Sequence, residues 1–181
     1  GDKPAMTQWR DGVKTREAYI TNGKKGRAGD KPYSIGYHMD GSKRFEMYGT
    51  GLQRHRDGDR PATIYWNKDG SLNKEQWSKD GVNSRDGDKP VFIKYDDKGR
   101  KTEVVYKKDG VYHRDTDNPS EITYDNGKLH SATYYKEGKM HRDDDKPAYI
   151  EYKFNGVDIE FVEYYKNDTE YIPKKVKESK R

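Results

Sequence analysis

Arginine and aspartate recur along this chain at one fixed spacing. An arginine stands three residues before an aspartate at five places: Arg27/Asp30, Arg56/Asp59, Arg85/Asp88, Arg114/Asp117 and Arg142/Asp145. A guanidinium group can donate two parallel hydrogen bonds to a carboxylate, so these residues either hold an acidic partner or pair with one another. We favour pairing within a repeat or with the next repeat. Four of these arginines are nevertheless candidate binding residues: Arg56, Arg85, Arg114 and Arg142.

The same segments carry groups that bind metal ions in other proteins. Aspartates stand two residues apart at Asp57/Asp59, Asp86/Asp88 and Asp115/Asp117, and a histidine precedes the arginine at His55, His113 and His141. Calcium needs six to eight oxygen ligands in a defined loop, and the EF-hand pattern is absent. Equivalent histidines of neighbouring repeats are expected roughly 10–14 Å apart, which is too far for two of them to bind one zinc ion. We therefore predict no metal site and no cofactor, and expect the histidines to cap turns or pack against neighbouring segments.

Familiar catalytic patterns are missing from the sequence. The chain has no cysteine, and no Gly-x-Ser-x-Gly, phosphate-binding loop or His-Glu-x-x-His occurs. A carboxylate that recurs in every repeat is more often structural than catalytic. We predict that the protein is not an enzyme and has no catalytic residues.

The elements that position these side chains follow from an internal repeat. The string Gly-Asp-Lys-Pro, or a close variant, places prolines at positions 4, 32, 61, 90, 119 and 147. The spacing is 28 or 29 residues throughout, which divides residues 1–173 into six repeats. The sequence thus predicts one β-repeat array over 1–173, followed by a basic tail over 174–181.

Each repeat has the alternation of a half-buried β-strand directly after its proline. Three residues after the proline stand Ile35, Ile64, Ile93, Ile122 and Ile150, and five residues after it stand Trp9, Tyr37, Trp66, Tyr95, Tyr124 and Tyr152. Asp-Gly and Asn-Gly turns then separate further short strands. No segment has helical periodicity, and one such unit cannot bury its aromatic face alone. The prediction is an all-β fold, an elongated tandem-repeat antiparallel β-hairpin ribbon or solenoid of two linked hairpins per repeat.

Composition agrees with a thin core and limits the possible partners. The chain is 29% hydrophobic and 38% charged, with a net charge of +5, and it has no apolar run long enough for a transmembrane helix. Residues 174–181 hold five basic residues and one glutamate, so the rest of the chain is almost neutral. Nucleic-acid binding is therefore expected only weakly, through the tail. The chain begins with Gly1 and no secretory signal, so we expect a processed product or a fragment. Its compartment is unknown; the lack of cysteine fits an intracellular or virion-associated protein.

The strand–turn–glycine units resemble MORN repeats. The resemblance rests on strings such as Tyr106-Lys107-Lys108-Asp109-Gly110 and Tyr135-Lys136-Glu137-Gly138 and covers about residues 1–165. The repeat is longer than the usual MORN unit, and its His-Arg-Asp-x-Asp-x-Pro-Ala connector is similar to tandem arrays of large DNA viruses and some bacterial proteins. The resemblance implies scaffolding, self-association or protein binding, and sometimes contact with membrane lipid.

Four tyrosines complete the candidate binding set, because they stand outside the inward-facing positions of the repeat or next to them: Tyr65, Tyr112, Tyr135 and Tyr165. They either contact a partner or cover the second face of a thin sheet. The function we predict is a non-enzymatic structural module for protein–protein binding or assembly, including self-association through an exposed sheet edge. The alternative is a module that binds anions or a membrane surface through the basic tail and lysine-bearing turns.

Overall fold

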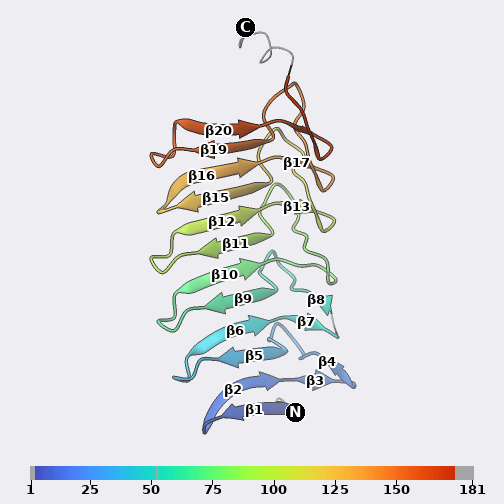
Figure 1. Ribbon diagram of the computed structural model, residues 1–181. Coiled ribbons are helices and arrows are strands. Elements are labelled where there is room, and N and C mark those ends of the chain that lie inside the picture. The colour runs from blue at the N-terminus through green and yellow to red at the C-terminus, as the bar shows by residue number, and fades with distance from the viewer. Residues whose placement is uncertain (1–2, 52, 174–181) are drawn as a thin grey trace.

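The computed structural model describes residues 3–51 and 53–173, and within these residues all regular structure is β, with no helix (Figure 1). The all-β prediction is confirmed. No helix in the described part of the chain is long and apolar enough to cross a membrane. The basic tail over 174–181, where the sequence predicted a weak anchor for nucleic acid, lies outside the described residues.

Long hairpins form one antiparallel sheet of twelve strands. The strands are β1 (Met6–Arg10), β2 (Val13–Ala18), β5 (Ser34–Tyr37), β6 (Lys43–Met47), β9 (Thr63–Trp66), β10 (Leu72–Gln76), β11 (Phe92–Tyr95), β12 (Lys101–Val105), β15 (Glu121–Asp125), β16 (Lys128–Thr133), β19 (Tyr149–Tyr152) and β20 (Ile159–Glu163). Their order in the sheet is their order in the chain, as the colour gradient of Figure 1 shows. The sheet is open rather than closed, because β1 and β20 each pair with one neighbour only.

Turn chemistry explains where the long hairpins reverse. In the β1–β2 hairpin, Asp11 and Gly12 both have positive φ, at 50° and 75°, and in the β15–β16 hairpin Asn126 and Gly127 have 51° and 80°. Two successive residues with positive φ define the tight turn whose twist matches that of paired strands. The predicted turns at these positions are confirmed.

Short hairpins form a second set along one flank of the sheet, on the right in Figure 1. They are β3 (Ile20–Thr21) with β4 (Lys24–Lys25), β7 (Gly49–Thr50) with β8 (Gln53–Arg54), β13 (Lys107–Lys108) with β14 (Val111–Tyr112), β17 (Tyr135–Lys136) with β18 (Lys139–Met140), and β21 (Tyr165–Lys166) with β22 (Thr169–Glu170). Between the second and third pairs, a single bridge joins Lys79 and Val82. Backbone hydrogen bonds connect successive members of the set, as from Gly138 N to Tyr112 O at 2.8 Å.

The register places one row of residues straight across all twelve strands. The row reads Thr7, Glu17, Ile35, Glu46, Ile64, Glu75, Ile93, Val104, Ile122, Ala132, Ile150 and Val162. Side chains alternate between the two faces of a strand, so this row defines one face, which we call the isoleucine face. Ile93 and Val104 are buried there with Trp77, and Tyr95 and Tyr124 pack against them.

The glutamates of the isoleucine face are hydrogen-bonded to tyrosines. Tyr37, Tyr48 and Tyr95 donate to Glu17, Glu46 and Glu75 at 2.7, 2.7 and 2.8 Å. Burial and the acceptor carboxylate together raise the pKa of Tyr95 to about 12. In later strands Val104, Ala132 and Val162 occupy the glutamate positions, so this row becomes fully apolar toward β20. Trp9, expected to point inward, is 64% exposed because β1 has a neighbour on one side only.

Candidate interaction surface

The connectors are the segments that join each short hairpin to the next long hairpin (residues 26–33, 55–61, 84–90, 113–119 and 141–147). Four equivalent arginines of the last four connectors each fork onto an aspartate of the connector before. Each Nε donates to one carboxylate oxygen and an Nη donates to the other. The pairs and their Nε–Oδ1 distances are Arg56–Asp30 at 2.8 Å, Arg85–Asp59 at 2.5 Å, Arg114–Asp88 at 2.6 Å and Arg142–Asp117 at 2.7 Å. Each fork spans 25 or 26 residues, because the chain makes a long and a short hairpin before it returns.

Each of these arginines also lies on an aromatic ring that follows the second strand of its long hairpin. The guanidinium carbon is 3.6–3.9 Å from the ring centroid in the pairs Arg56–Tyr48, Arg85–Trp77, Arg114–Tyr106 and Arg142–Tyr134. The remaining Nη donates to a proline carbonyl, as from Arg114 to Pro119 at 3.3 Å. We call this unit of arginine, aspartate and ring the arginine clamp. Planar stacking combined with a two-pronged ion pair is a geometry that lysine cannot reproduce.

The clamps support pairing over a free binding role for these arginines. Their side chains are only 14–15% exposed. The sequence spacing was misleading in one respect, since the partner of Arg56 is Asp30 and not Asp59, three residues on. Counted from its Asp-x-Pro string, each of these four repeats is closed by its own arginine. Whether Arg56, Arg85, Arg114 or Arg142 also contacts another molecule stays a prediction.

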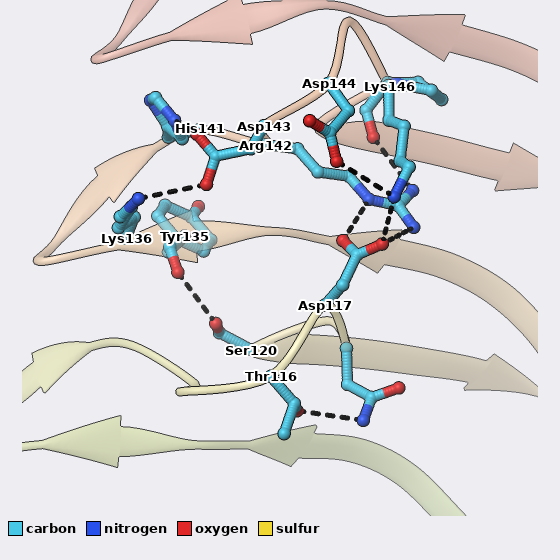
Figure 2. Close-up of polar contacts among 12 residues, drawn as sticks. Thr116, Asp117, Ser120, Tyr135, Lys136, His141, Arg142, Asp143, Asp144 and Lys146 are labelled. Atoms are coloured by element: carbon cyan, nitrogen blue, oxygen red, sulfur yellow. Dashed lines mark hydrogen bonds and ion pairs between the residues drawn. The ribbon is translucent and has the colours of Figure 1, made fainter.

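Several clamp aspartates accept a second cation from the following repeat. Lys146 Nζ lies 2.8 Å from Asp117 (Figure 2), and Lys89 Nζ lies 2.7 Å from Asp59. Hydrogen bonds from the arginine and then from the lysine lower the pKa of Asp59 and of Asp117 to about 2. These carboxylates therefore stay ionised, and they join each repeat to the next.

The histidines join successive repeats through the short hairpins. Nδ1 of His113 accepts the backbone N–H of Glu137 at 3.0 Å, and its Nε2 lies 3.0 Å from Asp115. His141 makes the same pair of contacts, with Asn167 at 3.3 Å and Asp143 at 2.8 Å. In both rings Nδ1 is the acceptor, which leaves Nε2 to donate to the aspartate. The expectation that these histidines cap turns is confirmed.

Open clefts lie between successive connectors. Three such connector clefts are equivalent. The largest of the three, of about 330 Å³, separates residues 113–118 from residues 141–144, and the other two, of about 250 and 200 Å³, lie farther toward β1. Thr116 and Tyr135 line the largest cleft, and the carboxylates of Asp143 and Asp144 stand 64% and 78% exposed at its rim. Among the described residues no group of three or more His, Asp or Glu side chains is arranged to hold a metal ion.

Two of the four candidate tyrosines meet, and the other two lie apart. The rings of Tyr112 and Tyr135, from neighbouring short hairpins, have centroids 4.8 Å apart, and Tyr135 lines the largest cleft. Tyr65 instead stacks on Phe45 at 5.6 Å within the large sheet, and Tyr165 donates to Glu163 at 3.3 Å. All four are half-buried rather than exposed.

The sequence interpretation missed one residue that ends the series of clamps. Tyr171 stands 29 residues after Arg142, where the repeat would place an arginine. Its hydroxyl donates to Asp145 at 3.0 Å, and its ring packs edge-on against Tyr164 at 6.2 Å. Extending the 29-residue period by one step would have found it.

Comparisons of the chain with protein-family models, with curated proteins and with solved structures found no match. The resemblance to MORN repeats accordingly stays a prediction that rests on the residues quoted for it.

Proposed function

We propose that this protein is a non-enzymatic repeat module for protein–protein binding or assembly, built from six MORN-like repeats of 28–29 residues. The observation that carries the proposal is the recurrence of equivalent clefts between successive connectors. Each cleft combines the tyrosine of an arginine clamp (Tyr48, Tyr106 or Tyr134) with an exposed connector carboxylate (Asp57, Asp115 or Asp143). Tyrosine is enriched among residues that dominate binding energy at protein interfaces.

Repetition of the cleft supports binding of an extended partner at several points. A partner segment that enters one cleft enters the next as an intramolecular event, so that weak contacts add up to appreciable affinity. The exposed rim carboxylates favour segments that carry lysine or arginine. The clamps and the histidine contacts hold the connectors in place, so that little conformational entropy is lost on binding.

Photo-crosslinking tests this function. A photoreactive side chain at Thr116, which lies in the largest cleft, should capture a protein from extracts of the native source, and the same group at the exposed turn residue Lys98 should not. Filling the cleft by Thr116→Trp should abolish binding of the captured protein, whereas Lys98→Trp should retain it. Binding that is equal in the two tryptophan variants would contradict the proposal.

A second candidate function, binding of an anionic surface, is favoured by one hollow near β1 and β2. The side chains of Arg10, Arg16, Arg44 and Lys68 line this hollow of about 440 Å³, and no carboxylate lines it. Sedimentation with anionic and neutral vesicles tests this alternative. Binding to anionic vesicles that disappears between low and physiological salt would support it, since contacts between exposed charges are screened over about 8 Å at 0.15 M salt.

A further inference from the structure

The face opposite the isoleucine face carries charges that are separated by sign. We call it the charged face. The register of strands β2 to β11 places the cations Arg16, Lys74 and Lys94 on it, and that of strands β12 to β20 places the carboxylates Glu103, Glu121, Glu151 and Glu163 on it. A fourth cation, Arg44, stands at the bulge of β6 and lies over the ring of Phe45, which belongs to this face. Contacts within this face agree with the assignment, such as Arg16 Nε to Ser34 Oγ at 3.0 Å and Tyr149 OH to Glu151 at 3.3 Å.

The sign changes between two directly opposed residues. Lys94 of β11 and Glu103 of β12 are cross-strand partners at the middle of the sheet. The whole chain follows the same division: residues 1–101 contain 22 Lys and Arg against 15 Asp and Glu, and residues 102–173 contain 10 against 16. Because strand order follows chain order, this difference in sequence becomes a difference between the two ends of the sheet.

These eight charges are not neutralised within the chain. None of them forms an ion pair within 4 Å among the described residues, whereas the connectors pair most of theirs. Lys74 lies over the Tyr65 ring at 4.2 Å, and Arg44 lies over the Phe45 ring at 5.3 Å. The hydroxyl groups of Tyr149 and Tyr165 donate to Glu151 and Glu163 but leave their negative charges unbalanced.

Glu121 shows that this arrangement has a cost in the isolated chain. Burial raises the pKa of Glu121, and the charge of Glu103 raises it further, against a smaller opposing effect of Lys107. Two carboxylates that disfavour each other's ionised form would be stabilised by a cation supplied from outside. The acidic half of the face therefore favours a cationic partner, and the basic half favours an anionic one.

We propose that the charged face binds the same face of a second copy of this chain, with the two sheets antiparallel in strand order. A twofold axis near Lys94 and Glu103 sets the basic half of each copy against the acidic half of the other, so one contact patch serves both subunits. A nucleic-acid strand or an anionic membrane would suit the basic half and be repelled by the acidic half. This inference rests on the proposed assembly function and names its partner.

Sedimentation of the full chain over a concentration series tests the pairing. At about 20 mM salt the protein should form dimers, and at about 500 mM salt it should be monomeric, because screening acts over roughly 20 and 4 Å at these ionic strengths. A monomer at every concentration in low salt would overturn the proposal. The proposal would also be overturned if the wild type stayed monomeric and its charged face bound a single-stranded oligonucleotide, since the basic half would then be an anion site.

Charge reversal identifies the surface that pairs. Lys74→Glu/Lys94→Glu reverses two of the four cations of the basic half, and Glu103→Lys/Glu151→Lys reverses two of the four carboxylates of the acidic half. Each variant alone should dimerise at least tenfold more weakly than the wild type, and an equal mixture should form heterodimers. The control Lys79→Glu/Lys98→Glu changes two exposed turn lysines by the same charge and should dimerise normally.

The mixing experiment separates a damaged fold from a damaged interface, because unfolded variants would not recover when mixed. Dimers that persist in both reversal variants, or a mixture that stays monomeric although both variants melt cooperatively, would overturn the proposal. The connector clefts involve different residues from the charged face. Loss of self-association with retained crosslinking at Thr116 would therefore refute this inference alone and leave the proposed function standing.

Discussion

Replacing Arg114 by alanine tests what the arginine clamps contribute to stability. The Arg114 side chain is 14% exposed, and it forks onto Asp88, which is 47% exposed. A partly exposed ion pair contributes at most ~1 kcal/mol, the hydrogen bond to the Pro119 carbonyl contributes about 1 kcal/mol, and the stacking on Tyr106 contributes roughly 0.5–1 kcal/mol. The free energy of unfolding should therefore fall by about 2–3 kcal/mol, from the sum of these central values.

Two measurements test this expectation. The melting temperature should fall by roughly 5–10 °C, since 1 kcal/mol shifts a chain of this size by about 2–4 °C. Amide hydrogen exchange should accelerate in β13 and β14 and at His113, and amides of β1 and β2 should keep their protection. The loss is local because each repeat contacts only its neighbours.

Matched variants make the reasoning refutable. Arg114→Lys keeps the charge but loses the fork and the planar stacking, so it should recover less than half of the lost stability. Arg10→Ala removes an arginine that is 78% exposed and should leave the melting curve unchanged. If Arg114→Ala melted like the wild type and lost a binding partner, the clamp would be a binding site and the structural interpretation would be wrong.

Three further predictions follow from single contacts. Gly36→Ala should lower the free energy of unfolding by about 1–3 kcal/mol, because a Cβ there would lie 2.1 Å from the Phe45 ring. Adding Phe45→Leu to this variant should recover part of the loss. If Gly36→Ala left the melting curve unchanged, the Phe45 ring would have to move freely. Asp59 and Asp117 have pKa values of about 2 in the folded chain, below the ordinary unfolded value of about 3.9, so their contribution is present above pH 4 and is lost as pH falls from 4 to 2. The free energy of unfolding measured by urea denaturation should drop over this interval by up to ~1 kcal/mol per partly exposed carboxyl. It should drop less in Asp117→Asn, and an equal drop in both proteins would contradict the assignment. Tyr171→Phe should lower stability by about 0.5–1 kcal/mol and accelerate hydrogen exchange only in β21 and β22, whereas Tyr171→Arg should restore a clamp on Asp145 and raise the melting temperature; equal melting of the two variants would count against the hydroxyl contact.

The strands and turns could be predicted because they are encoded locally. Isoleucines such as Ile64 and Ile93 recur three residues after proline, and the register joins them into one row across the sheet. Asp11-Gly12 and Asn126-Gly127 supply the positive φ angles that tight turns need. Each of these features depends on residues within a few positions of one another.

The clamp partners could not be read from nearest spacing because pairing depends on where the chain returns. Asp59 is three residues from Arg56 but pairs with Arg85, since the two hairpins of a repeat bring residues 26 positions apart together. The charged face was missed for a related reason. Summing charges over residues 1–173 gives 32 Lys and Arg against 31 Asp and Glu, a nearly neutral total. The alternation of side chains and the order of the strands nevertheless place cations such as Lys94 on one half of the face and carboxylates such as Glu103 on the other.

The agreement between strand order and chain order also has a kinetic consequence. Every pairing in the twelve-stranded sheet joins a strand to the next strand of that sheet along the chain, with at most one short hairpin between them, so no distant segment is needed to complete any part of the sheet. Proteins with such local contacts fold rapidly for a β topology, because only short loops must close. During synthesis β1 and β2 can pair as soon as they leave the ribosome, and each later hairpin adds to an existing template. The growing sheet therefore exposes two unpaired strand edges, the constant edge of β1 and the edge of the strand added last.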